Sequence, residues 1–154
     1  MERTLVLLKP DAVQRGLIGP ILARFEAKGL KVVALKMRQF PTALVQKHYE
    51  VHKDRPFYKA LVSFMTSGPT VALVLEGNSA IEVTRRLMGK TNAAEAEPGT
   101  IRGDFALSRS NNLVHGSDSP EAARKELALF FPDAGEVCEW NAPEFPWVYS
   151  PEER

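Results

Sequence analysis

The sequence of 154 residues lacks the features that define several classes of protein. Its one cysteine, Cys138, cannot form a disulfide within the chain, which excludes a disulfide-stabilised fold. Its 20 Lys and Arg residues nearly balance its 19 Asp and Glu residues, so a net charge of +1 provides no field that would attract nucleic acid or an anionic membrane. No apolar run approaches the roughly 20 residues of a membrane span. The first apolar run is interrupted by Lys9 and Asp11, unlike a secretory signal, so we expect a cytoplasmic protein with no membrane or nucleic-acid partner.

The composition is that of one globular domain. Hydrophobic residues make up 44% of the chain and charged residues 25%, close to globular averages and unlike a disordered segment. The length suits a single hydrophobic core, and no repeat or low-complexity linker divides the chain. We therefore expect a single domain over residues 1–154, with residues 132–154 as its C-terminal tail.

Local patterns predict strands and helices in an alternating order. Four apolar segments have the residue pattern of strands: 4–8, 30–40, 70–76 and 113–115. Helical spacing, or residues that start and stop helices, mark five further segments: 18–28, 42–52, 56–68, 79–88 and 119–130. This βαββαβ order with added helices predicts an α/β (α+β) fold, a ferredoxin-like antiparallel four-stranded sheet covered by helices. Such sheets serve many functions, so the fold alone does not identify the chemistry.

The segment 90–112 has weak periodicity and is rich in Gly, Pro, Ser and Asn. Irregular segments of this length within a compact domain are usually functional. We expect a long loop there that contributes to the active site.

Two short motifs resemble well-known sites but depart from them. Gly89-Lys90-Thr91 matches the end of a P-loop, yet that motif requires glycine where the chain has Thr84. His48 and His52 are one helical turn apart, as in a zinc-binding helix, but no glutamate directly follows the first histidine. We therefore predict neither a P-loop nor a catalytic zinc, and we expect the two histidines on an exposed or half-buried helix face.

The segment 111–119 has the features of a phosphate site. His115 ends a short predicted strand and is followed by Gly116, which permits close backbone approach, and by a helix start, whose N–H groups favour anions. Neutral imidazole can attack phosphorus without a separate base. His115 is thus a candidate nucleophile, although a structural or exposed histidine would give the same local pattern.

The segment 112–119, Asn-Leu-Val-His-Gly-Ser-Asp-Ser, resembles the active-site signature of nucleoside diphosphate kinases. Three further segments are similar to motifs of that family and follow in the same order and spacing: 8–19, 54–57 and 98–105. Together they cover the chain from about residue 3 to residue 131. The resemblance implies transfer of the terminal phosphate of a nucleoside triphosphate such as ATP to a nucleoside diphosphate, which maintains NTP and dNTP pools. It also implies a ping-pong mechanism through a phosphohistidine.

The resemblance assigns roles to particular residues. His115 matches the histidine that is phosphorylated, and Glu126 the carboxylate that accepts from its other ring nitrogen. The remaining matches pack around the histidine (Tyr49, Ser117), hold phosphates (Arg85, Thr91, Arg102), contact the sugar hydroxyls (Lys9, Asn112) or stack on the base (Phe57). Lys9 is also expected near the transferred phosphoryl group. Mg²⁺ is implied as an ion carried mainly by the nucleotide phosphates, with no protein ligand.

The C-terminal tail bears on assembly. Trp147-Val148-Tyr149 is similar to the C-terminal Trp-Ile-Tyr of the hexameric members, so the resemblance implies a hexamer, with a tetramer as the alternative, and oligomer contacts for residues 132–154.

Departures from the family are minor: Ala12 stands where the family often has glycine, and a proline common near Thr91 is absent. Two other functions stay open from the sequence, a catalytically idle nucleotide-binding relative and an RNA- or DNA-binding sheet. The first conflicts with the full set of matched residues, and the second with the near-neutral charge and the lack of an aromatic-rich RNP strand.

Overall fold

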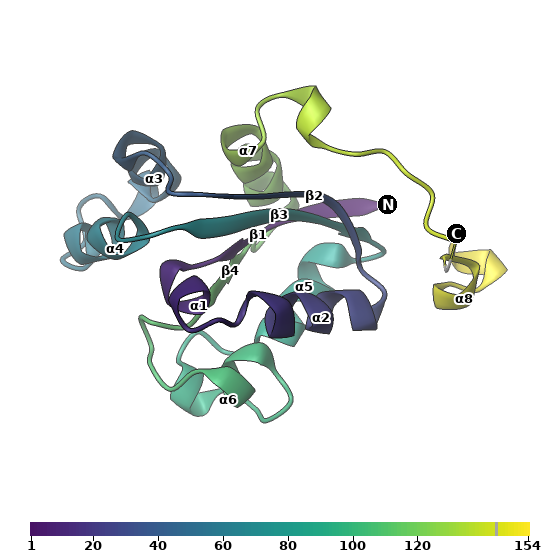
Figure 1. Ribbon diagram of the computed structural model, residues 1–154, viewed down its shortest axis with the longest axis horizontal. Coiled ribbons are helices and arrows are strands. Elements are labelled where there is room, and N and C mark those ends of the chain that lie inside the picture. The colour runs from purple at the N-terminus through teal and green to yellow at the C-terminus, as the bar shows by residue number, and fades with distance from the viewer. Residues whose placement is uncertain (144) are drawn as a thin grey trace.

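The computed structural model describes residues 1–143 and 145–154, and its centre is one antiparallel sheet (Figure 1). The four strands are β1 (Glu2–Leu8), β2 (Lys31–Arg38), β3 (Thr70–Gly77) and β4 (Val114–Gly116). They lie in the order β2-β3-β1-β4, and all neighbours are antiparallel. This topology is the predicted ferredoxin-like sheet, with the two longest apolar runs at its centre.

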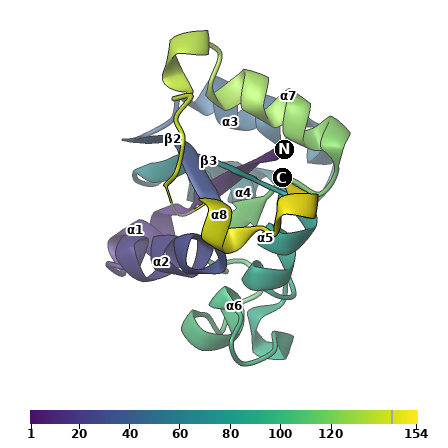
Figure 2. The same cartoon turned by 90° about the vertical axis from the view of Figure 1, so that its right-hand side faces the viewer.

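Helices cover both faces of the sheet (Figures 1 and 2). One face carries α1 (Pro10–Gln14), α2 (Ile18–Lys28), α5 (Ala80–Met88) and α6 (Ile101–Phe105). The other carries α3 (Thr42–His48), α4 (Tyr58–Met65) and α7 (Pro120–Phe130). The chain also forms the short helix α8 (Phe145–Val148) and four single 3-10 turns: η1 (Glu50–His52), η2 (Ala93–Glu95), η3 (Ala134–Glu136) and η4 (Pro151–Glu153). None of these described helices has the length and apolar character needed to cross a membrane.

The hydrophobic core is divided by the sheet into two layers. Because successive side chains of a strand point to opposite faces, Val6 and Leu8 of β1 pack under α2 and α5. Leu5 and Leu7 pack instead with residues of α3, α4 and α7, such as Phe130. Burial on both faces explains why β1 and β3 read as continuous apolar runs rather than as alternating ones.

The structure refines several predicted boundaries. Pro10 ends β1 as expected but also starts α1, which the sequence analysis missed; proline at the first position of a helix lacks only an N–H that would be unpaired there. The predicted helix 42–52 stops at His48 and continues as η1. The final strand lies one residue later than predicted, because Leu113 adopts a left-handed φ of 74° before β4 starts. Within the predicted loop 90–112, η2 and α6 form two short helical turns.

The C-terminal tail folds back across the start of β2 and the β3–α5 turn. The Asn78 N–H donates to Tyr149 Oη over 3.0 Å, and Trp140 Nε1 donates to the Val32 carbonyl over 3.1 Å. Gly29 has a φ of 99°, and a Cβ at that position would lie 2.6 Å from Val148 Cγ1, so glycine is needed there both for the turn and for the tail. Trp147, however, is 90% exposed.

Candidate active site

His115 lies on the short edge strand β4, on the face that carries α3 and α7. In the antiparallel ladder it is opposite Leu7, and opposed residues of paired strands point to the same face. The Lys9 N–H donates to the Leu113 carbonyl over 2.8 Å, which fixes the start of β4 beside the end of β1. Gly116 allows α5 to approach closely, since a Cβ there would lie 2.7 Å from Met88 Sδ. His115 is thereby set on rigid backbone with its side chain 23% exposed.

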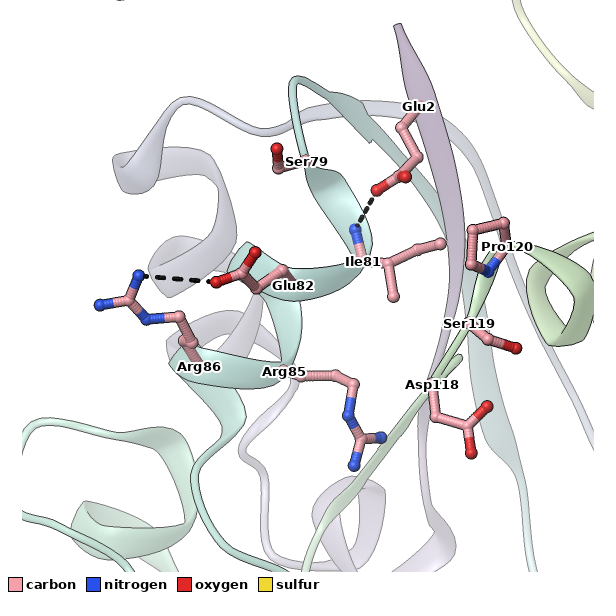
Figure 3. A pocket seen from close by; sticks show the side chains of 9 residues that line it. All are labelled: Glu2, Ser79, Ile81, Glu82, Arg85, Arg86, Asp118, Ser119 and Pro120. Carbon is pink, nitrogen blue, oxygen red and sulfur yellow. Dashed lines mark hydrogen bonds and ion pairs between the residues drawn. The ribbon is translucent and has the colours of Figure 1, made fainter.

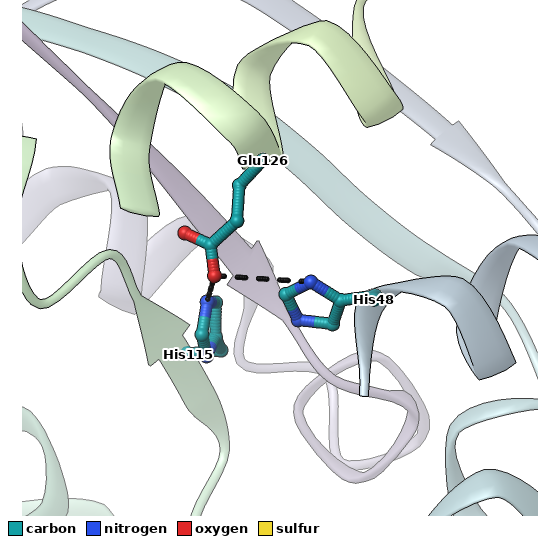
Figure 4. Close-up of side chains that lie close together, drawn as sticks. All are labelled: His48, His115 and Glu126. Atoms are coloured by element: carbon teal, nitrogen blue, oxygen red, sulfur yellow. Dashed lines mark hydrogen bonds and ion pairs between the residues drawn. The ribbon is translucent and has the colours of Figure 1, made fainter. Parts of the chain in front are cut away.

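A carboxylate from α7 orients the histidine ring (Figure 4). His115 Nε2 and Glu126 Oε1 are 2.8 Å apart, and the Ser117 hydroxyl donates to Glu126 Oε2. His48, at the end of α3, approaches the same carboxylate from the other side, with 3.7 Å between its Nδ1 and Glu126 Oε1. The His48 and His115 rings are perpendicular, with centroids 4.8 Å apart. Three elements thus meet at one carboxylate, and the ring of His115 is held in a defined orientation.

Two buried cations, Lys9 and Arg102, line the same cavity as His115. Lys9 Nζ donates to Asn112 Oδ1 over 2.9 Å, and Asn112 Nδ2 donates in turn to the Thr91 carbonyl over 2.9 Å. Arg102 is only 5% exposed and donates to three main-chain carbonyls, those of Gly89, Asn112 and Val114, over 2.7 to 3.2 Å. These bonds use three of the five guanidinium N–H groups, so two remain for a ligand. Arg102 therefore both fixes the segment 89–114 and presents a positive charge.

Arg85 of α5 makes fewer hydrogen bonds to the protein than Arg102 does. Its Nη1 donates to the Gly116 carbonyl over 3.2 Å, and its side chain lies between the main cavity and a smaller neighbouring hollow. Because it has one long hydrogen bond where Arg102 has three, Arg85 has more freedom to adjust to a ligand.

The residues that resemblance singled out converge on one cavity of about 1020 Å³. Eight of the ten line it directly: Lys9, Tyr49, Arg85, Thr91, Arg102, Asn112, His115 and Glu126. Ser117 is fully buried behind Glu126, and Phe57 lies at the margin, half exposed, with its ring centroid 5.4 Å from that of His52, which lines the cavity. A histidine on its carboxylate support faces three cations in a space that is large enough for a nucleotide.

Comparison with known proteins identifies the family to which this arrangement corresponds. The family model described as nucleoside diphosphate kinase matches residues 2–135. The chain belongs to the nucleoside diphosphate kinase family. The nucleoside diphosphate kinase of Archaeoglobus fulgidus is 53% identical over 149 residues, which are 97% of this chain and 98% of that protein. That of Microcystis aeruginosa is 52% identical over 96% of this chain and 99% of its own length.

Solved structures agree with this membership. The halophilic nucleoside diphosphate kinase from Halobacterium salinarum, determined in complex with CDP, superimposes with a TM-score of 0.93 at 50% identity, over 96% of this chain and 98% of that one. A nucleoside diphosphate kinase family protein from Babesia bovis gives a TM-score of 0.93 at 46% identity, over 97% of this chain and 100% of that one. The chain is therefore a nucleotide-binding phosphotransferase, a nucleoside diphosphate kinase with the ferredoxin-like fold, as the sequence analysis predicts.

Burial and hydrogen bonding shift the pKa values of several groups in this site. Burial, helped by the nearby Arg102, lowers the pKa of Lys9 to about 8, and burial with the charge of Arg85 lowers the pKa of Arg102 to about 10. Burial and the neighbouring His115 lower the pKa of His48 to about 3, so His48 is neutral at physiological pH. The pKa of Glu126 is lowered: burial opposes its charge, but His115 and Ser117 hydrogen-bond to the charged form and outweigh burial. Burial raises the pKa of Tyr49, which keeps its hydroxyl protonated.

His48 is a site residue that the sequence patterns did not indicate. They predict an exposed or half-buried helix face for it, but only 3% of the side chain is exposed. A usable signal was present, because Val45, His48 and Tyr49 follow helical i, i+3, i+4 spacing and Tyr49 had been assigned to the site. His52, the other member of the pair, lies instead beside Phe57 at the cavity margin.

A second, smaller hollow of about 490 Å³ adjoins the cavity beyond Arg85 (Figure 3). Glu2 from the first strand accepts a hydrogen bond from the Ile81 N–H over 2.7 Å, and Glu82 is ion-paired with Arg86. Glu82 and Arg86 are the pair of lining side chains that bind each other, and Glu2 is held by a main-chain N–H. Arg85, Asp118 and Ser119 line both spaces, so this hollow extends the rim of the nucleotide site.

Proposed function

We propose that His115 carries the phosphoryl group between two nucleotides in a ping-pong reaction. The observation that supports this most strongly is the 2.8 Å contact of His115 Nε2 with Glu126 Oε1. An ionised carboxylate can only accept a hydrogen bond, so Nε2 carries the hydrogen and donates it. The lone pair of the ring is then on Nδ1. In the first half-reaction, Nδ1 forms a bond to the terminal phosphorus of a nucleoside triphosphate such as ATP, and the bond to the bridging oxygen breaks. The nucleoside diphosphate leaves with that oxygen.

The second half-reaction is the reverse with a different nucleotide. A terminal oxygen of the acceptor diphosphate attacks the phosphorus, the P–N bond breaks, and His115 returns to its neutral form. A covalent intermediate lets one set of groups serve donor and acceptor in turn. The buried carboxylate of Glu126 stabilises the positive charge that develops on the ring while Nδ1 is bonding.

The cations that line the cavity, Lys9, Arg85 and Arg102, are suited to bind phosphates. We assign phosphate binding to Arg85, Arg102 and Thr91, since two guanidinium groups can spread charge over several phosphate oxygens. We assign Lys9 to the transferred group and, with Asn112, to the sugar hydroxyls, as the resemblance implies; a hydrogen bond links the two side chains. Phe57, half exposed at the margin, offers its ring face to any base, which favours broad base tolerance.

Mg²⁺ enters in this proposal as part of the substrate. The phosphate side of the cavity presents Lys9, Arg85 and Arg102, and cations do not coordinate a metal ion. This donor set fits phosphate oxygens rather than a bare divalent ion. Mg²⁺ prefers oxygen ligands and keeps several waters, so nucleotide phosphates and water are sufficient to hold it, and when bound it neutralises phosphate charge.

Intact-protein mass spectrometry tests the mechanism directly. After brief exposure to ATP and Mg²⁺, the chain should gain one acid-labile phosphoryl group, and adding a different nucleoside diphosphate should remove it. His115→Ala should gain none, should lose at least about 10³-fold in turnover, and should keep its melting temperature within a few degrees.

The chain contains three histidines, which provides a matched control. His52→Gln removes another imidazole beside the same cavity and should still gain the phosphoryl group. Phosphorylation of the His115→Ala chain, or an unphosphorylated but folded wild-type chain that binds nucleotide, would refute the phosphohistidine route.

We also propose that residues 1–154 form one domain that assembles as a hexamer, with a tetramer as the alternative, and that the tail 132–154 contributes to the contacts. Trp147 is 90% exposed, and the edge strand β2 exposes Leu35 and Met37, each more than half. Exposed apolar groups of this size are typical of surfaces that become buried on association. Light scattering on diluted protein tests this, since a stable monomer would contradict it.

A further inference from the structure

His48 lies beside His115 and Glu126, and the proposed phosphoryl transfer gives it no role. We propose that His48, His115 and Glu126 form a three-ligand site for Zn²⁺ or a similar transition-metal ion, and that an ion bound there blocks phosphorylation of His115.

The geometry brings three donors together from three separate elements. His48 ends α3, His115 is in β4 and Glu126 is in α7, and their ligand atoms lie within 4.8 Å of one another. Glu126 Oε1 is shared, 2.8 Å from His115 Nε2 and 3.7 Å from His48 Nδ1 (Figure 4). In a tetrahedral zinc site with bonds of roughly 2.0–2.1 Å, neighbouring donor atoms are about 3.3 Å apart. Small side-chain rotations therefore suffice to surround one ion.

The donor set matches zinc and not magnesium. Two imidazoles and one carboxylate are the ligands of many catalytic zinc sites, with the fourth position left to water. His115 and Glu126 line the open cavity, so a water has room at that position and an ion has a path to the site. Mg²⁺ strongly prefers oxygen ligands, so the millimolar ion that accompanies the nucleotides does not compete for two imidazoles.

His48 is available as a ligand because, among the residues that the structure describes, no hydrogen bond holds either of its nitrogens. Its Nε2 is buried and has no hydrogen-bond partner among the described residues. Its Nδ1 is 3.7 Å from the carboxylate, which is too long for a hydrogen bond. A buried imidazole in this condition gains a bond when it coordinates an ion, so it loses no existing interaction in exchange.

Metal binding would change the tautomer of His115. To coordinate an ion through Nε2, the ring must offer the lone pair of that nitrogen, so the hydrogen moves from Nε2 to Nδ1 through solvent and the ring stays neutral. Nδ1 then bears a hydrogen and has no free lone pair to attack phosphorus. The binding stands by itself, whereas the inhibition rests on the proposed role of His115.

The binding test uses the nucleotide-free protein in a Cys138→Ser background, because the exposed thiol is a separate metal ligand. Isothermal titration with Zn²⁺ should show one ion per chain, and Co²⁺ should give the intense visible absorption of a tetrahedral complex. His48→Phe and His48→Gln should each weaken binding by at least about tenfold, since one of three ligands is lost. His52→Gln, the matched histidine control, should bind as the parent does.

Two results would overturn the site: unchanged affinity in both His48 variants whose circular dichroism is native, or equal loss of binding in His52→Gln. Excess Mg²⁺ that displaced the Co²⁺ signal would also contradict the choice of ion.

Intact-protein mass spectrometry tests the inhibition by zinc. The chain is exposed to ATP and Mg²⁺ with and without prior Zn²⁺, and its mass is measured. Zinc should prevent gain of the phosphoryl group in the Cys138→Ser parent, a zinc-selective chelator should restore it, and the two His48 variants should be less sensitive to the same zinc concentration. Because zinc also binds ATP, this difference between chains is the informative comparison. A zinc-loaded parent that is still phosphorylated refutes inhibition, whereas a zinc-free parent that is never phosphorylated refutes the role of His115 and leaves the binding result intact.

Discussion

Two groups of residues in the cavity differ in how their charge is compensated: the histidine side, which contains His115 and Glu126, and the cation side, which contains Lys9 and Arg102. On the histidine side, the Glu126 carboxylate is surrounded by groups that hydrogen-bond to it, and its pKa is lowered. On the cation side, Lys9 and Arg102 are buried and form no ion pair within the described residues; their hydrogen bonds go to neutral amide and carbonyl oxygens. Their pKa values are lowered, because burial there outweighs stabilisation of the charge. The charge of Glu126 is therefore compensated by its hydrogen-bond donors, whereas the charges of Lys9 and Arg102 have no counter-ion among the described residues.

This difference indicates what each side is for. A buried charge that lacks a counter-ion is costly to the folded protein, and the cost falls when an anion binds. Neutral oxygens fix the position of Lys9 and Arg102 without cancelling their charge, so in the proposed function both groups are free to pair with a polyphosphate. The carboxylate of Glu126 instead holds the ring of His115 in one orientation. Substitutions on the two sides should therefore fail in different ways.

The largest expected effect comes from the cation side. Arg102→Met should lower the free energy of unfolding by about 3 kcal/mol, because two buried and one part-buried main-chain carbonyl lose their donors, and should reduce kcat/KM by at least about 10³-fold. Arg85→Met should lower kcat/KM by a similar order yet cost less than about 1 kcal/mol, since Arg85 makes one long bond. Urea denaturation and steady-state kinetics on both chains measure the two quantities. Equal stability losses would show that the bonds of Arg102 do not hold the segment.

On the histidine side, Glu126→Gln should reduce the rate of phosphorylation by about 10- to 100-fold while changing nucleotide affinity little. The amide keeps the shape but lacks the charge that stabilises the developing imidazolium, and its NH₂ group cannot accept from Ser117. Single-turnover phosphorylation measured against nucleotide concentration separates rate from affinity. Ser117→Ala serves as the comparison, because it removes one bond to the carboxylate and keeps the carboxylate charge, so its rate loss should be smaller. The opposite ranking would mean that Ser117 has a role of its own.

How much of this comparison the sequence could predict depends on the range of the interaction. The strands, the main helices and their order along the chain follow from apolar spacing and from cap residues such as Ser119 and Pro120, which are local signals. Resemblance supplied the ten site residues, and the structure brings eight of them to one cavity. The sequence could not show that Arg102 is buried against carbonyls of residues 89–114, or that His48 shares a carboxylate with His115, because both depend on how α3, α5, α6 and α7 pack. Likewise α1 was missed because Pro10 is both a strand end and a favourable helix start.

Phe57 belongs to neither group of residues, and its substitution should affect nucleotide binding without affecting stability. Phe57→Ala removes a half-exposed ring, so stability should change by less than about 0.5 kcal/mol. KM should rise about tenfold or somewhat more for every nucleotide tested, because each base loses a stacking surface. Comparing adenine and cytosine nucleotides in steady-state assays checks this, with Phe57→Tyr as the variant that retains the ring. A loss confined to one base would contradict stacking as the role of Phe57.

The smallest expected effect concerns the charge of Lys9, and it has opposite signs for binding and for stability. Lys9 loses its proton as pH rises through about 8, so nucleoside diphosphate affinity should fall about threefold or somewhat more between pH 7 and pH 9. Stability should move the other way. Between about pH 8 and the ordinary lysine value of 10.5, the unfolded chain holds a proton that the folded chain has released, so this group makes the free energy of unfolding rise with pH. Calorimetric titration and urea denaturation across this range, with Lys9→Met as the reference, should show both trends in the wild type and neither in the variant. If both trends persist in Lys9→Met, another group titrates, and the unsatisfied charge that distinguishes the two sides of the cavity does not reside on Lys9.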